Sequence, residues 1–301
     1  MFTRLFIVCL MLFSMHINHS HAQTTPEGNE LLKKIQARLA AETGEFALAF
    51  MDLQTNEQIR WNERTSFHAA STMKTPVMVE VFKQVAAGKL SLTDSLVVKN
   101  EFKSIVDGSN YTLNPSDDSE FTLYKLVGTK VTLYDLVYQM IILSSNLATN
   151  MVIELVDGKN VTQTMRELGA DDMQVLRGVE DGKAFEKGLN NSVTAYDLMI
   201  LYQALAAGTI VNSKACEDMI RILLDQRYND IIPAYLPKDL KVAHKTGSIT
   251  GVHHDSGIIF LPDGRKYVLV ILSRKLADAD KATEAMARVS EMIYRYMAAK
   301  K

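Results

Sequence analysis

The chain has 301 residues, of which 47% are hydrophobic and 23% are charged, and its formal net charge is −2. This near-neutral balance gives no indication of the basic surface that nucleic-acid-binding proteins present. The length allows one large domain or two closely packed lobes around a sizeable core. The sequence has neither a cysteine cluster nor a His-x-x-x-His spacing, so we expect no metal and no other cofactor.

The amino terminus has the pattern of a secretory signal peptide. A short positive start ending at Arg4 precedes an apolar run over residues 5–15, which is too short to span a bilayer as a helix. Small residues then precede a predicted cleavage site after Ala22, and the short run disfavours the alternative of a membrane anchor. Cleavage would remove Cys9 and leave Cys216, so no disulfide within the mature chain is expected. We therefore expect a secreted or periplasmic protein.

Hydrophobic periodicity predicts three groups of elements along the mature chain. A helix and a β-hairpin come first, a long helical region follows, and three strands with a closing helix end the chain. Two helix starts, at Thr132 and Thr194, have a capping residue followed three positions later by an aspartate. Residues 91–130 and 178–192 are predicted to be mostly irregular. The predicted helices span residues 29–43, 71–87, 132–140, 149–156, 162–168, 194–207, 213–224 and 281–299, and the predicted strands span 45–53, 58–61, 241–247, 251–261 and 265–272.

This order of elements predicts an α+β fold. The amino-terminal hairpin and the last three strands would form one antiparallel five-stranded sheet, covered by the first and last helices, beside an all-helical lobe. Residues 23–301 would form a single catalytic domain, with an α/β lobe at about 23–65 and 210–301 and a helical lobe at about 66–209. A cleft between two such lobes is a favoured place for a small-molecule site.

The stretch from Phe67 to Pro76 contains a candidate activated nucleophile. Ser71 and Lys74 lie three residues apart, and a helix beginning at Ser71 would place both side chains on one face. An amine whose pKa is lowered can take the proton of a neighbouring hydroxyl and so make it a nucleophile. Taken alone this spacing is a weak signal, because serine and lysine are common and a helix start with Lys74 in solvent would give the same pattern.

Two further stretches supply partners for this pair. Ser144-Ser145-Asn146 interrupts a helical pattern in the predicted helical lobe, and Lys245-Thr246-Gly247 ends a predicted strand. Each has an ordinary explanation when taken alone, a turn in one case and a strand end in the other. In this order, however, the three stretches resemble the S-x-x-K, S-D-N and K-T-G motifs of the class A β-lactamase family, a group of penicillin-recognising serine hydrolases. The resemblance covers nearly the whole mature chain.

The resemblance implies three residues with catalytic roles. Ser71 looks like the acylated nucleophile, and Lys74 looks like the amine that activates it. Ser144 looks like the hydroxyl that relays a proton to the leaving nitrogen. The backbone N–H of Ser71, together with that of Ser248, would form the oxyanion hole.

The resemblance also implies a set of substrate-binding residues. Asn146 would hold the substrate side chain and contact the activating amine. Lys245 would raise the local potential, which favours an anionic substrate, and Thr246 would meet the substrate carboxylate. Gly247 would avoid crowding a ligand that lies along the strand edge, and Ser248 would line the same edge.

The sequence departs from the family pattern at three places. Ser145 stands where the family usually has an aspartate, and this change is expected to weaken the support of the loop. In the family pattern Arg-x-Glu-x-x-Leu-Asn, the glutamate would be the deacylating base. Here Glu180 follows Arg177 one residue later than in that pattern. Glu186 is followed by the expected Leu and Asn, but it lies too far from Arg177. We place Glu180 slightly ahead on loop position. The stretch 252–257 lacks the arginine that often holds the substrate carboxylate.

These features predict a periplasmic serine β-lactamase that hydrolyses the lactam amide through an acyl-serine intermediate. Because the deacylating glutamate is uncertain, two alternatives stay open on the same fold. One is a D-Ala-D-Ala carboxypeptidase or related penicillin-binding serine hydrolase, and the other is a β-lactam sensor that stays acylated. The expected partner is a small-molecule β-lactam or a peptide ending in D-Ala-D-Ala, bound by a monomer.

Overall fold

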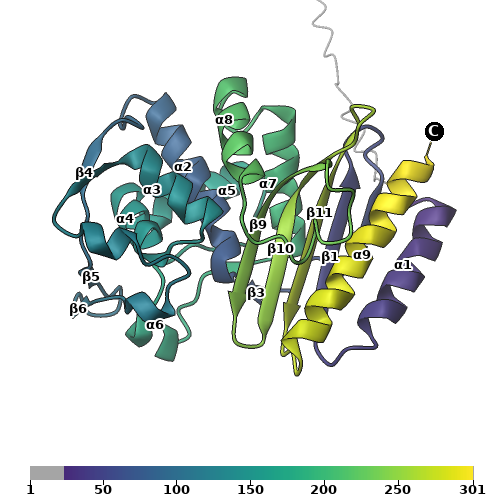
Figure 1. The fold of residues 1–301 in the computed structure, drawn as a ribbon, viewed down its shortest axis with the longest axis horizontal. Coiled ribbons are helices and arrows are strands. Elements are labelled where there is room, and N and C mark those ends of the chain that lie inside the picture. Colours follow the sequence, from purple (N-terminus) through teal and green to yellow (C-terminus); the bar gives the residue numbers. More distant parts are fainter. Residues whose placement is uncertain (1–23, 301) are drawn as a thin grey trace, which may run out of the picture.

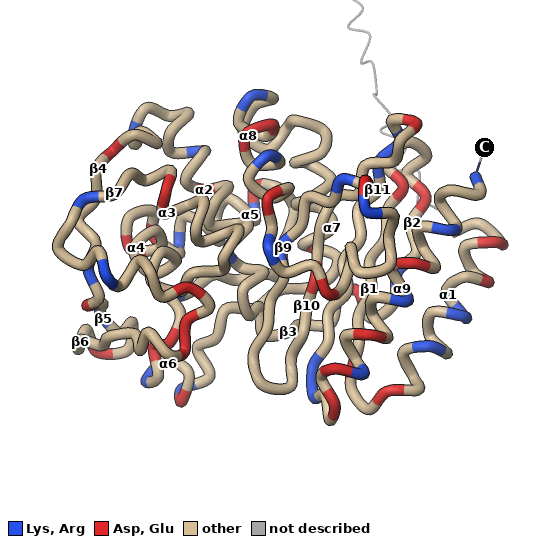
Figure 2. Tube along the Cα trace, viewed as in Figure 1, with Lys and Arg blue, Asp and Glu red and all other residues tan. Residues whose placement is uncertain are grey.

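The computed structural model describes residues 24–300, so the predicted signal peptide over residues 1–22 lies outside the described residues. The chain folds into a sheet with helices on both faces and a helical lobe beside it (Figure 1). None of the described helices is both long and apolar enough to cross a membrane. Acidic and basic residues both occur along the outer helices (Figure 2).

The central sheet has the five antiparallel strands that the sequence predicts. The strand order is β2-β1-β11-β10-β9, so the amino-terminal hairpin pairs with the last strand of the chain, and β9 forms an edge. The turn at Pro262-Asp263-Gly264 joins β10 to β11, and Gly264 has the positive φ of +89° that such a turn requires. The strands are β1 Glu45–Asp52, β2 Gln58–Trp61, β9 Lys241–Ile249, β10 Val252–Phe260 and β11 Lys266–Arg274.

Alternation along β1 divides the core between the two faces of the sheet. Phe46, Leu48 and Phe50 pack beneath α1 (Pro26–Leu39) and α9 (Ala279–Ala299), while the residues between them face the helical lobe. Figure 1 shows α1 and α9 side by side on the outer face. Both core layers are continuous and apolar, so the sheet is fixed firmly between them.

The helical lobe begins with a 3₁₀ turn, η1 (Ala70–Met73), that leads directly into α2. Thr132 forms a complete capping box with Asp135 at the start of α3, and Thr194 accepts the N–H of Asp197 at the start of α7, as predicted. The predicted loop over 178–192 contains a short helix, because Asp181 caps it by accepting the N–H of Ala184. The helices are α2 Lys74–Ala86, α3 Leu133–Ile142, α4 Asn146–Val156, α5 Gly158–Glu167, α6 Gly182–Glu186, α7 Ala195–Ala207 and α8 Ser213–Leu224.

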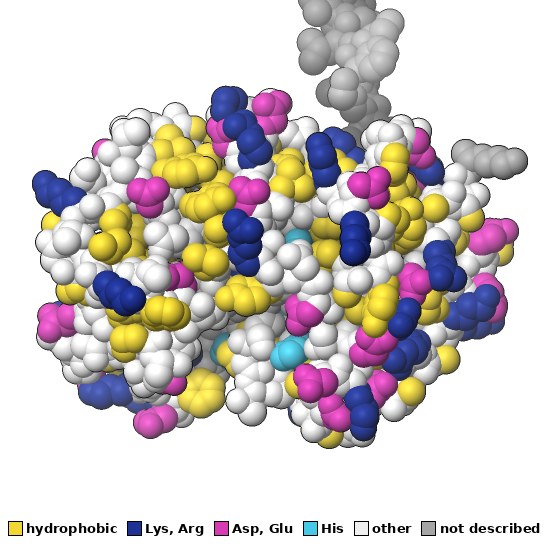
Figure 3. Space-filling model, viewed as in Figure 1, with side chains coloured by type: hydrophobic (Ala, Val, Ile, Leu, Met, Phe, Trp, Pro, Cys, Tyr) yellow, Lys and Arg dark blue, Asp and Glu magenta, His cyan; other side chains and the backbone are white. Residues whose placement is uncertain are grey.

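The stretch 91–130 is mostly irregular, as expected, and its short strands pair with one another. They are β4 Ser95–Val97, β5 Phe102–Lys103, β6 Asn110–Tyr111 and β7 Lys130–Thr132, while β3 Phe67–His68 pairs with β8 Ser192–Val193. The edge strand β9 contacts η1 and α8, so the helical lobe meets the sheet along this edge. Histidine side chains lie along this junction on the face shown in Figure 3.

Candidate active site

Ser71 and Lys74 lie at the change from the 3₁₀ turn η1 to α2. The predicted helix start at Ser71 is therefore one turn early, since the α-helix begins at Lys74. Side chains three residues apart eclipse one another in a 3₁₀ helix, so this turn places Ser71 and Lys74 on the same face. Ala70 has a φ of +44°, an uncommon conformation for a residue with a side chain, which marks a constrained turn immediately before Ser71.

Lys74 is fully buried and donates to three oxygens across the lobe. Its Nζ lies 2.6 Å from the Ser144 carbonyl oxygen, 3.2 Å from Ser144 Oγ and 2.9 Å from Asn146 Oδ1. Burial lowers the pKa of Lys74 to about 7, although the negative charges of Asp118 and Glu180 oppose this shift. The amine can therefore exchange a proton near neutral pH.

Ser144 lies between α3 and α4, at the junction of the two lobes. Its φ of +57° ends the helical path of α3, and Asn146 then starts α4. Ser144 Oγ accepts hydrogen bonds from Lys74 Nζ at 3.2 Å and from Lys245 Nζ at 3.1 Å. A hydroxyl has two acceptor positions and one proton, so this arrangement leaves the Ser144 proton free for an acceptor in the cleft.

Lys245 lies on β9, opposite Lys74 across Ser144. It is also fully buried, and its Nζ donates to the Thr246 carbonyl oxygen at 2.9 Å as well as to Ser144 Oγ. Burial and the charge of Lys74 hold the pKa of Lys245 well below its usual range, and Asp255 acts in the opposite direction. Lys245 therefore contacts Ser144 from the sheet side of the junction.

The cleft itself holds about 260 Å³, and its lining includes four serines and Thr246 as well as the larger side chains of Tyr228, His253 and His254. Both lysines lie behind its wall rather than on it. The five sequence-predicted residues that line it come from η1, from the α3–α4 junction and from β9, and they are Ser71, Ser144, Thr246, Gly247 and Ser248. The structure thus brings residues from three distant stretches to one small-molecule-sized cleft.

Gly247 is needed for a reason other than ligand crowding. A Cβ at this position would lie 3.0 Å from the backbone nitrogens of Ser71 and Thr72 and 3.2 Å from the Ala70 side chain. The glycine therefore lets β9 pack directly against η1, which brings the nucleophile beside the strand edge.

The loop that carries the candidate glutamates is closed by side chains at its two ends. Arg177 donates to the Leu189 carbonyl oxygen at 2.8 Å and to Asn190 Oδ1 at 3.0 Å, while Asn191 bonds the backbone of Arg177. Asn150 of α4 then binds both backbone polar groups of Val179, at 2.6 and 3.0 Å. These contacts fix the residue that follows, Glu180.

Glu180 reaches the site and Glu186 does not. Asn146 Nδ2 donates to Glu180 Oε1 at 2.9 Å, so one amide bridges Lys74 and Glu180. Glu180 reaches solvent on one side, but its partial burial raises the pKa of the carboxyl, as do the neighbouring charges of Asp118 and Asp117. Glu186 is exposed at the last residue of α6. The backbone of Glu180 has a positive φ of +62°.

Sequence reasoning missed Asp118. Its carboxylate accepts the backbone N–H of Asn146 at 2.9 Å and that of Leu147 at 3.0 Å, and the Tyr124 hydroxyl donates to it at 2.9 Å. Ser145 is fully buried and caps the same helix by accepting the N–H of Ala148. No local signal marks Asp118, because it lies in a turn-rich stretch 28 residues before its partner.

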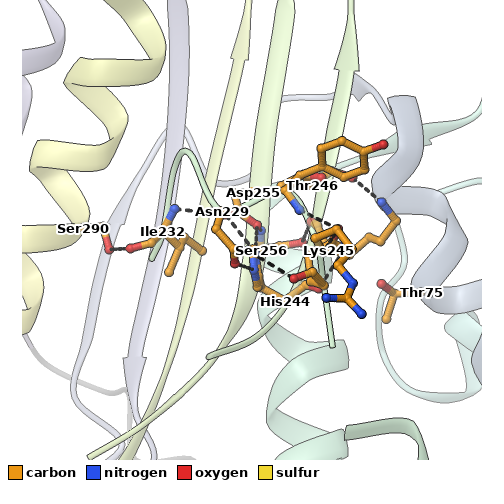
Figure 4. Close-up of polar contacts among 12 residues, drawn as sticks. Thr75, Asn229, Ile232, His244, Lys245, Thr246, Asp255, Ser256 and Ser290 are labelled. Atoms are coloured by element: carbon orange, nitrogen blue, oxygen red, sulfur yellow. Dashed lines mark hydrogen bonds and ion pairs between the residues drawn. The ribbon is translucent and has the colours of Figure 1, made fainter. Parts of the chain in front are cut away.

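A second missed group is the buried pair of His244 and Asp255 (Figure 4). His244 Nδ1 lies 2.9 Å from Asp255 Oδ1, and the ring reaches across the sheet because Gly257 leaves the space opposite it. Asn229 Nδ2 donates to a carbonyl oxygen, so its Oδ1 faces His244 Nε2 at 3.1 Å. Both ring nitrogens therefore lie within hydrogen-bond distance of a side-chain oxygen.

Asp255 also connects the sheet to the loop beside the cleft. It accepts the N–H of Ile232 at 3.0 Å, and the Ile232 carbonyl oxygen accepts the Ser290 hydroxyl of α9 at 2.8 Å (Figure 4). The preceding residues Tyr228, Asp230 and Ile231 line the cleft. The sheet core thereby supports one wall of the site.

The two adjacent histidines of β10, His253 and His254, both line the cleft but have different partners. His253 bonds Thr283 of α9, and His254 bonds the carbonyl oxygen of His68. Ser256 is buried and bonds the Lys245 carbonyl oxygen rather than facing the cleft. Among residues 24–300, no group of three or more His, Cys, Asp or Glu side chains could hold a metal ion.

The fold, the cleft and the three motifs define a protein of the penicillin-recognising group. Residues 30–297 match the Beta-lactamase enzyme family, and the chain belongs to that family. It is similar to a β-lactamase of Bacteroides uniformis, with 26% identity over 97% of this chain and 98% of the relative. It is also similar to β-lactamase VEB-1 of Pseudomonas aeruginosa, with 22% identity over 95% of this chain and 93% of the relative.

Solved structures agree with this family. A β-lactamase from Sphaerobacter thermophilus has a TM-score of 0.78 and 28% identity, covering 90% of this chain and 98% of its own. The structure of PBP-A has a TM-score of 0.76 and 25% identity, covering 89% and 96%. A mutant of PBP-A was solved as an acyl-enzyme complex with penicillin G. Family and relatives together support a hydrolase that acts on β-lactams, and the sequence-based expectations for family and fold are confirmed.

Proposed function

We propose that the protein is a class A-type serine β-lactamase that works through an acyl-Ser71 ester. One observation carries the proposal: two buried lysines donate to the same Ser144 hydroxyl, beside a cleft that Ser71 lines. This arrangement supplies a base for the nucleophile and a proton for the leaving nitrogen without a cofactor.

Acylation would use the residues in the following way. Neutral Lys74 takes the proton of Ser71 Oγ, which attacks the lactam carbonyl carbon. The backbone N–H groups of Ser71 and Ser248 stabilise the oxyanion of the tetrahedral intermediate. When the carbon–nitrogen bond breaks, Ser144 donates its proton to the lactam nitrogen and regains one from Lys74, which ends neutral. The field of Lys245 favours the substrate carboxylate beside Thr246 and Ser248.

Deacylation would depend on Glu180. Its carboxylate takes a proton from water, the resulting hydroxide attacks the ester carbonyl, and Ser71 leaves with the proton returned through Lys74. A carboxyl with a raised pKa is a better base near neutral pH than an ordinary one. The contact with Asn146 favours this residue over Glu186.

Two alternatives share the acylation step. The likeness to PBP-A favours a D-Ala-D-Ala peptidase as the second candidate, and a sensor that stays acylated is the third. The deciding experiment mixes the purified protein with a chromogenic cephalosporin and follows both colour and protein mass. Sustained turnover identifies a β-lactamase. A one-to-one burst with a persistent adduct identifies a peptidase or a sensor, and D-alanine release from a D-Ala-D-Ala peptide separates these two.

Two variants test the assigned residues. Ser71→Ala should form no adduct, and an adduct that survives this change would overturn the whole assignment. Glu180→Gln should accumulate the acyl-enzyme, whereas its matched control Glu186→Gln should turn over as the wild type does. The opposite result would move the deacylating base to Glu186.

We also propose that the mature protein is a periplasmic monomer. The signal-peptide pattern that ends at Ala22 supports export. Mass spectrometry of protein recovered from the periplasmic fraction should give an amino terminus at Gln23, and size-exclusion chromatography with light scattering should give the mass of one chain.

A further inference from the structure

We propose that Asp118 is a positioning residue for acylation: its carboxylate fixes the start of α4 so that Asn146 holds Lys74 and Glu180 together. The inference rests on the proposed function of Lys74 and Glu180. Asp118 itself is outside the three motifs and lines no part of the cleft described above.

The contacts of Asp118 converge on one helix start. Both carboxylate oxygens lie 2.9 Å from the Asn146 nitrogen, and Oδ2 also accepts the Leu147 N–H at 3.0 Å. The Tyr124 hydroxyl holds the same oxygen at 2.9 Å, and the Glu120 N–H holds the other at 3.2 Å. The half-buried carboxylate is therefore held from its own loop while it binds α4.

This anchor controls the geometry of the reacting groups because Asn146 is its direct partner. The Asn146 side chain accepts from Lys74 at 2.9 Å and donates to Glu180 at 2.9 Å. A negative group at a helix start accepts hydrogen bonds from otherwise unpaired N–H groups and is attracted by the positive end of the helix dipole. Ser145, the other cap of α4, supplies a neutral hydroxyl to Ala148 and leaves the Asn146 and Leu147 N–H groups to Asp118.

Asp118 also contributes charge to both titrating groups. The charges of Asp118 and Glu180 both raise the pKa of Lys74, whereas burial lowers it. The other nearby cation, Lys245, lies on the far side of Ser144. Asp118 also raises the pKa of Glu180, together with Asp117. Removing the charge should therefore lower the pKa of both groups, whereas a purely structural support would alter neither.

The test compares Asp118→Asn with Asp117→Asn. The adjacent Asp117 is exposed and its side chain bonds Asn114 within its own loop, so it is a matched control for charge without the α4 contact. Acylation rates with a chromogenic cephalosporin would be measured from pH 5 to 9 by rapid-quench mass spectrometry. Asp118→Asn should lower the plateau rate about tenfold and move the acid limb to lower pH, and Asp117→Asn should leave both unchanged.

A second measurement does not depend on activity. In protein labelled with ¹³C-lysine, the Lys74 signal, assigned by its loss in Lys74→Arg, should titrate at lower pH in Asp118→Asn than in the wild type. If wild-type protein forms no adduct, the proposed function fails and this titration still decides the effect of Asp118 on Lys74. An unchanged titration together with an unchanged acylation profile would overturn the inference.

A milder variant guards against misfolding of Asp118→Asn. Tyr124→Phe keeps the carboxylate and removes one of its donors, so acylation should slow by about twofold with the acid limb in place. If Asp118→Asn does not fold, and folded Tyr124→Phe acylates at the wild-type rate, Asp118 has no positioning role.

Discussion

The two buried lysines of the site differ in the origin of their counter-charges. Lys74 and Lys245 both donate to Ser144 Oγ and both have lowered pKa values because of burial. The carboxylates that oppose this effect at Lys74 come from loops of the helical lobe, and both Asp118 and Glu180 contact Asn146. The carboxylate near Lys245 lies in the sheet.

That carboxylate, Asp255, also has other partners in the core. It pairs with His244 and accepts backbone N–H groups of Ile232 and Ser256, so it is fixed in the core. The negative charges that act on Lys74 therefore come from two loops of the helical lobe, whereas the carboxylate that acts on Lys245 is built into the sheet. Like charges on both lysines would repel, so the two environments together decide which amine is charged.

The largest effect should follow removal of Lys74. Lys74→Ala should slow acylation by about 10³-fold, which corresponds to about 4 kcal/mol, because the nucleophile loses its base. Single-turnover mass spectrometry measures the rate. An equal loss of acylation rate in Lys245→Ala would show that the two lysines do not have separate roles.

Removal of the buried carboxylate of Asp255, on the strand next to β9, should lower the stability of the fold. Asp255→Asn leaves His244 without its anionic partner and should lower the free energy of unfolding by about 3 kcal/mol. Urea titration followed by circular dichroism measures this change. Asp263→Asn, at the exposed turn after β10, is the matched control and should change stability little, because its pair with Arg265 is at the surface.

Lys245 should affect binding more than chemistry. Lys245→Ala removes the cation behind Thr246 and should raise KM for an anionic β-lactam about 30-fold, or about 2 kcal/mol, with a smaller loss in kcat. Steady-state kinetics at two salt concentrations checks the split. A loss confined to kcat would assign Lys245 to proton transfer instead.

The smallest effect concerns the pH profile of acylation. In the proposed mechanism Lys74 acts in its neutral form, and its pKa is about 7, so the acylation rate should fall as pH decreases through that value, reaching about a tenth of the plateau one unit below. Glu180→Gln removes a charge that raises this pKa, so its acid limb should lie at lower pH. Glu186→Gln should superimpose on the wild type, and a shift there would contradict the assignment of Glu180.

The sequence by itself determined the elements and the three motifs. Capping at Thr132 and Thr194 and apolar periodicity are local signals, and the structure reproduces each within a few residues. The order of Ser71, Ser144 and Lys245 identified the family because three motifs together are far more specific than one.

Only the tertiary structure decided how these residues work together. Which of Glu180 and Glu186 contacts Asn146 depends on how Asn150 and Asn146 hold the loop, and both asparagines lie about 30 residues away in sequence. Asp118 left no local signal because carboxylate contacts to a distant helix start have no period in the sequence. The lowered pKa of Lys74 likewise arises from burial, which depends on how the lobes pack rather than on neighbouring residues.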